Sequence, residues 1–131
     1  MVRSLVRWVP VLAWMAVIFG LSATPGSRLP SHFPSALGHF VAYAVLGGLL
    51  VLALGKRAPY GRSVAIAVIL ASLYGVTDEF HQAFVPLRTP DVADWGMDTL
   101  GAFVGAWFTA WLALYVAQRR DRVVEDAGRP Q

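Results

Sequence analysis

The stretch that decides the fold is SVAIAVILASLYGVTDEFHQAFVPLRTPDVADWGMDTLGAFVGAWFTAWLALYVA, residues 63–117. It consists of two long apolar runs separated by a short polar region, from Thr77 to Asp98. Apolar runs of about 20 residues predict membrane-spanning helices. Five of the chain's eight acidic residues lie in the polar region, and residues 1–77 contain none. Acidic groups between such helices are costly in hydrocarbon, so they usually face a cavity and mark a functional site.

The composition of the whole chain also indicates a membrane protein. Its 131 residues are 56% hydrophobic and only 15% charged, and the mean hydropathy is +0.55, which does not suit a soluble domain. The absence of cysteine excludes disulfides, thiolate catalysis and cysteine-ligated metal. The chain is basic, but its cations are spread over short connectors without a basic–aromatic motif, so no nucleic-acid partner is predicted. We predict one domain, residues 1–131, because no linker or repeat interrupts it.

Four apolar segments predict an all-α integral membrane protein, a bundle of four transmembrane helices. They cover residues 5–23, 37–54, 63–80 and 90–117, with a polar tail at 118–131, and Pro- and Gly-rich breaks separate them. The first segment also resembles a secretory signal, but it is long and Leu21 suits a cleavage site poorly, so we retain it as a helix. In the fourth, Thr89 is the expected N-cap and Pro90 the first helical residue. At about 42 Å this helix is longer than a bilayer core of about 30 Å. Its first turns therefore protrude from the membrane, tilt, or fold back as a re-entrant segment, and the sequence does not decide among these alternatives.

The cations predict how the bundle is oriented. Nine of the eleven Lys and Arg residues lie at the start of the chain, in the second connector or in the tail, against only Arg28 and Arg88 in the other two connectors. The positive-inside rule therefore places both termini in the cytoplasm. The first and third connectors, and the acidic region with them, then face outward.

Polar and small residues recur at helical spacing in three of the predicted helices. The faces are His39–Tyr43–Gly47, then Ala67–Ala71–Gly75–Glu79, and finally Asp91–Asp94–Asp98–Gly101–Gly105. Small residues at this spacing allow close helix contact in membranes, so the polar members should point into the bundle. Asp91 is expected mainly to begin the last helix. Arg88, the only cation near these acids, either forms a structural ion pair with one of them or binds an anionic ligand.

The polar region resembles the signature of the VanZ-like family of small membrane proteins. That signature has an acidic pair, a glutamine, an aromatic residue, Pro, Arg, Asp and spaced glycines, which here are Asp78, Glu79, Gln82, Phe84, Pro86, Arg88, Asp94, Gly101 and Gly105. The stretch GHFVAYAVLG, with His39 and Tyr43, resembles the family's second helix, and the similarity covers residues 10–115. Asp98 stands where the family usually has Asn, which adds negative charge to the site.

The resemblance implies a multi-pass protein of the bacterial cytoplasmic membrane with a role at the cell envelope. The family is named after a component associated with resistance to the glycopeptide antibiotic teicoplanin, and the resemblance implies no reaction. The first hypothesis is therefore a binding module whose outward pocket holds an amphipathic envelope molecule, a lipid-linked cell-wall precursor or a glycopeptide. Its expected ligand-binding residues are His39, Tyr43, Asp78, Glu79, Gln82, Arg88, Asp94 and Asp98.

Two alternatives stay open. An intramembrane enzyme acting on lipid-linked substrates would use Glu79 or Asp98 as general base and His39 as proton shuttle, with Mg²⁺ or Ca²⁺ held by Glu79, Asp94 and Asp98. A proton-coupled transporter would relay protons through the same acids, but four short helices leave little room for alternating access without an oligomer. We favour binding, because no GxSxG, HExxH or Gly-rich phosphate motif is present. Membrane lipids are expected partners in every case.

Overall fold

The computed structural model describes residues 5–28, 35–55 and 60–127, and all regular structure in these ranges is helical. The elements are α2 (Val9–Ser22), the short 3-10 helix η1 (Gly26–Arg28), α3 (Ser35–Leu54), α4 (Tyr60–Gln82) and α5 (Val92–Ala127). The predicted all-α class is therefore confirmed for the described part of the chain.

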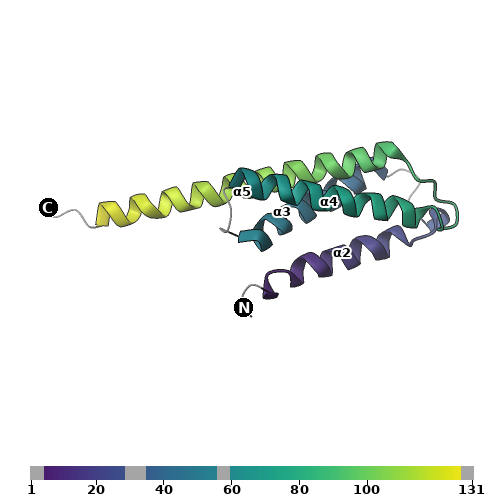
Figure 1. The fold of residues 1–131 in the computed structure, drawn as a ribbon, viewed down its shortest axis with the longest axis horizontal. Coiled ribbons are helices and arrows are strands. Elements are labelled where there is room, and N and C mark those ends of the chain that lie inside the picture. The colour runs from purple at the N-terminus through teal and green to yellow at the C-terminus, as the bar shows by residue number, and fades with distance from the viewer. Residues whose placement is uncertain (1–4, 29–34, 56–59, 128–131) are drawn as a thin grey trace.

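The four α-helices run alternately up and down along one axis (Figure 1). The end of α2, the start of α3, the end of α4 and the start of α5 meet at one end of the bundle. α3, α4 and α5 pack against one another, while α2 lies along α3 and α4 on the side away from α5. The C-terminal part of α5 extends past the other helices at the opposite end.

Glycines bring the backbones of α3 and α5 into direct contact. Gly101 and Gly105 of α5 lie against the backbone carbonyls of Phe40 and Ala44 in α3, and Gly47 of α3 meets α5 in the same way. A Cβ atom at any of these three glycines would collide with the facing backbone. The small-residue face predicted for the last helix is thus confirmed, and it holds α3 and α5 at a fixed separation.

The other two predicted faces are also buried. On α4, Ala67 and Ala71 are fully covered, and Gly75 and Glu79 continue the same buried stripe. His39, Tyr43 and Gly47 form the buried stripe of α3.

Hydrogen bonds attach α2 to this core. The Trp14 indole donates to the Ala42 carbonyl of α3 at 2.8 Å, and the Tyr74 hydroxyl of α4 donates to the Met15 carbonyl at 2.7 Å. Buried indole and phenol groups usually find such a partner, because an unpaired polar group in an apolar interior is costly.

The ends of the first and last helices differ from the predicted ones. α2 begins at Val9, after a turn closed by a bond from the Trp8 amide to the Leu5 carbonyl. α5 begins at Val92 because Asp91, rather than the predicted Thr89, accepts a bond from the first-turn amide of Ala93 at 2.8 Å. This is the usual action of an N-cap residue.

The extra length of α5 lies at its C-terminal end. The helix continues to Ala127 through most of the predicted tail, whose arginines and glutamate are good helix formers. Residues 83–91, before α5, form turns, a bend and irregular backbone rather than a re-entrant helix. Among them, the Pro86 carbonyl accepts a bond from the Gly26 amide, which fastens this connector to the one that follows α2.

Three of the described helices, α3, α4 and α5, are long and apolar enough to cross a membrane. Large apolar side chains such as Leu52, Leu73 and Trp107 are exposed on their outer surfaces, as expected for lipid-facing positions. α2 has 14 residues, which is about 21 Å at 1.5 Å per residue and shorter than the bilayer core. The membrane-protein class is confirmed by three candidate spans, whereas the fourth span and the orientation stay predictions.

Candidate functional site

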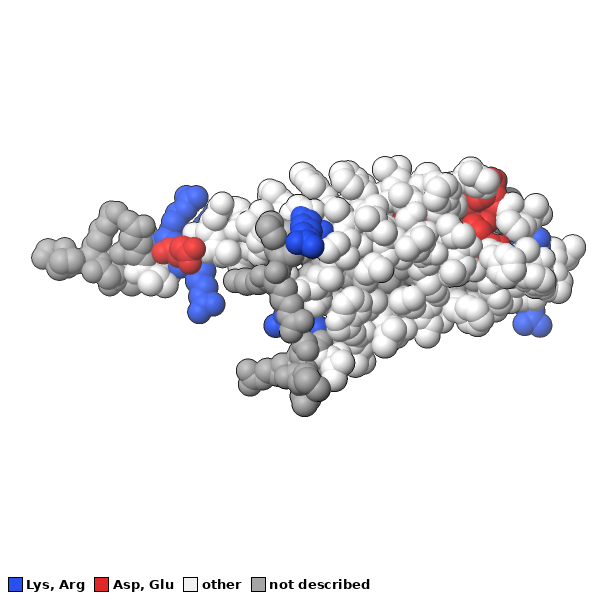
Figure 2. Space-filling model, in the orientation of Figure 1, with Lys and Arg blue, Asp and Glu red and all other residues white. Residues whose placement is uncertain are grey.

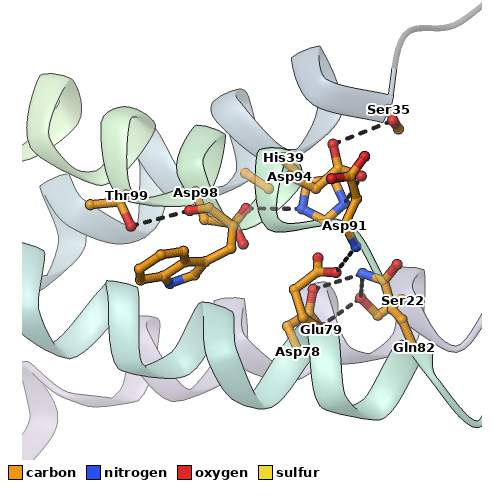
Figure 3. Close-up of polar contacts among 12 residues, drawn as sticks. Ser22, Ser35, His39, Asp78, Glu79, Gln82, Asp91, Asp94, Asp98 and Thr99 are labelled. Carbon is orange, nitrogen blue, oxygen red and sulfur yellow. Dashed lines mark hydrogen bonds and ion pairs between the residues drawn. The ribbon is translucent and has the colours of Figure 1, made fainter. Parts of the chain in front are cut away.

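Polar side chains from four helices meet at the end of the bundle where α4 ends and α5 begins (Figure 3). We call this group the polar layer; it consists of Ser22, His39, Asp78, Glu79, Gln82, Asp94 and Asp98. His39 lies in the second turn of α3, Glu79 in the last turn of α4, and Asp94 in the first turn of α5. Because α3 and α5 both begin at this end of the bundle and the antiparallel α4 ends there, these three turns lie at one height. Figure 2 shows acidic side chains at this end and most Lys and Arg side chains toward the other.

His39 lies between two carboxylates of α5. Its Nδ1 atom is 2.9 Å from Asp98 Oδ1, and its Nε2 atom is 3.7 Å from Asp94 Oδ2. Asp98 is 0% exposed, and Gly75 provides the space for it, since a Cβ there would lie 2.9 Å from Asp98 Oδ2. Asp98 thus holds one side of the imidazole and leaves Nε2 facing Asp94.

A second network surrounds Asp78. Ser22 Oγ donates to Asp78 Oδ1 at 2.6 Å, and Gln82 Nε2 lies 3.2 Å from both Asp78 Oδ2 and Ser22 Oγ. All three side chains are buried. Asp78 and Gln82 were predicted to lie in the site, whereas Ser22 was not. The sequence indicates Ser22 only as a hydroxyl residue at the end of an apolar segment. The spacing of residues within one helix does not show which residue of another helix this hydroxyl contacts.

Glu79 connects α4 to the start of α5. Its Oε2 atom accepts a bond from the Asp91 backbone amide at 2.8 Å. Its Oε1 atom is buried and has no hydrogen-bond partner among the described residues. Asp91 itself is exposed and caps α5, so the structure confirms its expected role at the helix start. One oxygen of Glu79 is therefore held and the other is unused.

A partly open cavity of about 290 Å³ lies next to the polar layer. Ile18 and Leu21 of α2 and Ala42 of α3 form apolar parts of its wall. Its polar lining consists of Ser22, Thr24, Ser35, His39, Tyr43, Asp78 and Arg88. The volume is at the lower end of small-molecule sites, and a mostly apolar wall with a few polar groups is typical of them.

Only half of the predicted ligand-binding residues line this cavity. They are His39, Tyr43, Asp78 and Arg88. The other four, Glu79, Gln82, Asp94 and Asp98, belong to the polar layer but not to the cavity wall. Arg88 forms no ion pair with any described carboxylate, and its Nε atom is buried without a hydrogen-bond partner among those residues. The structural ion pair considered for Arg88 is thus not seen in the described part of the chain.

The catalytic candidates His39, Glu79 and Asp98 all lie in the polar layer. Among the described residues no serine or threonine hydroxyl bonds to His39, and Ser22 donates to a carboxylate instead. No activated nucleophile is therefore assembled there, and catalysis stays a prediction. The potential metal ligands that come together are His39, Glu79 and Asp94, within 4.8 Å of one another. In this set His39 takes the place predicted for Asp98, because Asp98 lies on the other side of the imidazole.

Fold and site together define a small polytopic membrane protein with a buried layer of ionisable residues near one end of its bundle. The VanZ/LLP1 family model matches residues 7–114, so the chain belongs to this family and the resemblance seen in its sequence is confirmed. Comparisons with curated proteins and with solved structures found no match. Family membership supports a membrane protein associated with teicoplanin resistance.

Proposed function

We propose that the protein binds an amphipathic, anionic envelope molecule, such as a lipid-linked cell-wall precursor, in the cavity beside the polar layer. The observation that carries the proposal is the presence of two unpaired polar groups in the cavity wall. The Tyr43 hydroxyl and the Arg88 Nε atom are buried and have no hydrogen-bond partner among the described residues. Leaving such a group unpaired costs about 1–3 kcal/mol. A ligand that pairs with both groups recovers this free energy.

The chemistry of the wall defines the ligand. The Arg88 guanidinium suits a phosphate or carboxylate, which it can bind through two parallel hydrogen bonds. The Tyr43 hydroxyl suits a hydroxyl or amide group of the same molecule. Ile18 and Leu21 offer an apolar surface for a hydrocarbon chain. An anionic head group joined to a lipid chain combines all three features.

The size of the cavity selects between the envelope ligands considered. A volume of about 290 Å³ corresponds to roughly ten water molecules at about 30 Å³ each. This space holds a head-group fragment or part of an acyl chain, but not the whole of a glycopeptide antibiotic. We therefore favour a lipid-linked precursor, with the lipid tail of a glycopeptide as the second ligand of the same chemistry.

The proposal includes an outward-facing cavity in the bacterial cytoplasmic membrane, with both termini in the cytoplasm. Of the described cations, five lie at or beyond the end of the bundle opposite the polar layer, because they stand just before α2, at the start of α4 or in the C-terminal part of α5: Arg7, Arg62, Arg119, Arg120 and Arg122. Arg28 and Arg88 lie near the layer itself. The positive-inside rule supports this orientation. Arg3, Lys56, Arg57 and Arg129, which also entered the sequence-based count, lie outside the described residues.

The proposed orientation needs α2 to cross the membrane as a fourth span. Together with the turn before it, the segment from Leu5 to Ser22 is up to about 27 Å long at 1.5 Å per residue, which approaches the thickness of the core. Arg7 lies beside Gly55 at the end of α3, so the start of this segment and the end of α3 share one side. Exposed Leu12 and Phe19 give α2 a lipid-compatible outer face.

Native mass spectrometry of the protein purified in mild detergent tests the proposed ligand. We expect an anionic lipid-linked molecule to co-purify, or to bind on addition of an undecaprenyl-phosphate-linked precursor, and to be lost in Arg88→Gln. Arg28→Gln, which removes the other described cation near this end, should retain the ligand. The proposal is refuted if the precursor does not bind, or if both variants bind it as tightly as the wild type.

A growth assay connects binding to resistance. In a host that expresses the chain, we expect the inhibitory concentration of teicoplanin to rise, and Arg88→Gln to remove the increase while Arg28→Gln preserves it. Equal protection by both variants at equal expression would contradict a role for the cavity in resistance.

A further inference from the structure

We propose that His39, Glu79 and Asp94 bind a divalent first-row transition-metal ion, with Zn²⁺ as the representative, and that Asp98 positions His39 for this purpose. The site lies beside the cavity and shares only His39 with it. The inference goes beyond the proposed function and does not depend on which molecule occupies the cavity.

The first support is the spacing of the three side chains, which come from three different helices. His39 Nε2 and Asp94 Oδ2 are 3.7 Å apart. Two ligands at about 2.0–2.1 Å from a tetrahedral Zn²⁺ are about 3.3 Å apart, so this pair needs to close by only a few tenths of an ångström. Glu79 offers an oxygen within 4.8 Å of both. Adjustment of its flexible side chain, by up to about 1.5 Å, can supply the remaining movement.

The second support is an unused polar atom in the same place. Glu79 is only 9% exposed, and its Oε1 atom is buried without a hydrogen-bond partner among the described residues. The Asp91 amide holds the other oxygen at 2.8 Å. A buried carboxylate oxygen without a partner is costly, and pairing with a cation removes that cost. The carboxylate is thus anchored at one oxygen and available at the other.

The third support is the way in which His39 is held. Asp98 Oδ1 lies 2.9 Å from Nδ1, on the side of the ring away from Asp94. Metal-binding histidines commonly donate their second ring N–H to a carboxylate, which fixes the tautomer and aims the other nitrogen at the metal. In this tautomer the Nε2 lone pair faces Asp94, an arrangement that is repulsive unless a cation lies between them. Asp98 is therefore a positioning residue rather than a metal ligand.

The ligand set also selects the metal. The carboxylate set predicted from the sequence suits Mg²⁺ or Ca²⁺, but those ions take oxygen ligands and rarely imidazole. One imidazole with two carboxylates suits Zn²⁺ and its first-row neighbours. Three protein ligands leave a fourth position open on Zn²⁺. Because His39 also lines the cavity, that open position is close to the proposed ligand.

Isothermal titration calorimetry of the chelator-treated protein with Zn²⁺ alone tests the site. We expect one bound ion per chain, and binding weakened at least about 100-fold in His39→Gln, Glu79→Gln or Asp94→Asn. Asp98→Asn should weaken binding by roughly 10- to 100-fold, the usual effect of losing an outer partner. The matched control is Asp78→Asn, which alters a neighbouring buried acid outside the set and should leave Zn²⁺ affinity within about threefold of the wild type.

X-ray absorption spectroscopy of the Zn²⁺-loaded wild type identifies the atoms bound to the metal. It needs no variant, so its result does not depend on whether the variants fold. We expect one imidazole nitrogen and oxygen ligands at about 2.0–2.2 Å. Absence of Zn²⁺ binding, a spectrum without imidazole, or equal loss of affinity in Asp78→Asn would overturn the proposal.

Discussion

Replacing Gly101 by alanine should separate α3 from α5 and break the polar layer without changing any polar residue. A Cβ at position 101 would lie 3.0 Å from the carbonyl carbon of Phe40 and closer still to its oxygen, whereas ordinary contacts begin at 3.4 Å. Both Phe40 atoms belong to the helix backbone and cannot rotate away. Relieving the contact therefore requires the two helices to move apart by on the order of 1 Å.

This movement would reach the polar layer, because its members lie next to the contact. His39 directly precedes Phe40 in α3, and Asp98 lies one turn before Gly101 in α5. The distance from His39 Nδ1 to Asp98 Oδ1, now 2.9 Å, would grow to roughly 3.9 Å, which is too long for a hydrogen bond. Overpacking of this kind costs about 1–3 kcal/mol. We expect Gly101→Ala to lower the free energy of unfolding by that amount.

Unfolding in mixed detergent micelles by added dodecyl sulfate, followed by tryptophan fluorescence and circular dichroism, measures the change. Gly96→Ala is the matched control on the same helix, because a Cβ at Gly96 meets nothing within 4 Å. This control should be neutral or stabilising by up to about 1 kcal/mol, the helix-propensity difference between glycine and alanine. The reasoning is refuted if the two variants unfold at the same detergent composition.

Three smaller perturbations test neighbouring parts of the account by the same unfolding measurement. Gly75→Ala should destabilise less than Gly101→Ala, since its Cβ would meet the side chain of Asp98 at 2.9 Å rather than backbone; an equal or larger loss would contradict this order. Asp91→Ala should cost about 0.5–2 kcal/mol by removing the cap of α5, and Asp91→Ser should restore most of it; no difference between the two would exclude capping. Ser22→Ala should cost about 1.5–3 kcal/mol, because it removes a hydrogen bond to a buried carboxylate; wild-type stability would exclude that bond.

The parts of the fold that follow from one helix at a time could be predicted from the sequence. The small residues on α4 and α5 recur at helical spacing, and the structure buries them as that spacing requires. The positions of Asp94 and Asp98 on one face of α5 follow from the same periodicity. Periodicity within single helices therefore predicts most residues of the polar layer.

The pairing of residues between helices could not be predicted in this way. The bond from Ser22 to Asp78 joins positions 56 residues apart, and it depends on how α2 and α4 lie against each other. Likewise, periodicity placed Asp98 near the site but could not show that it meets the far side of the His39 ring. The C-terminal extension of α5 was missed because the prediction ended the helix where the apolar run ends. Helix propensity and side-chain contacts, such as the bond from Arg119 to Tyr115 at 3.0 Å, continue beyond that point.

The central claim is that polar groups in the cavity wall bind a ligand and do not stabilise the folded protein. A comparison of two tyrosines tests this claim directly. The Tyr43 hydroxyl has no partner among the described residues, whereas the Tyr74 hydroxyl donates to the Met15 carbonyl. The decisive measurement is precursor affinity and unfolding free energy for Tyr43→Phe beside Tyr74→Phe. The account predicts that Tyr43→Phe loses affinity by about tenfold at unchanged or higher stability, and that Tyr74→Phe loses about 1 kcal/mol of stability. Unchanged affinity in a stable Tyr43→Phe variant would contradict it.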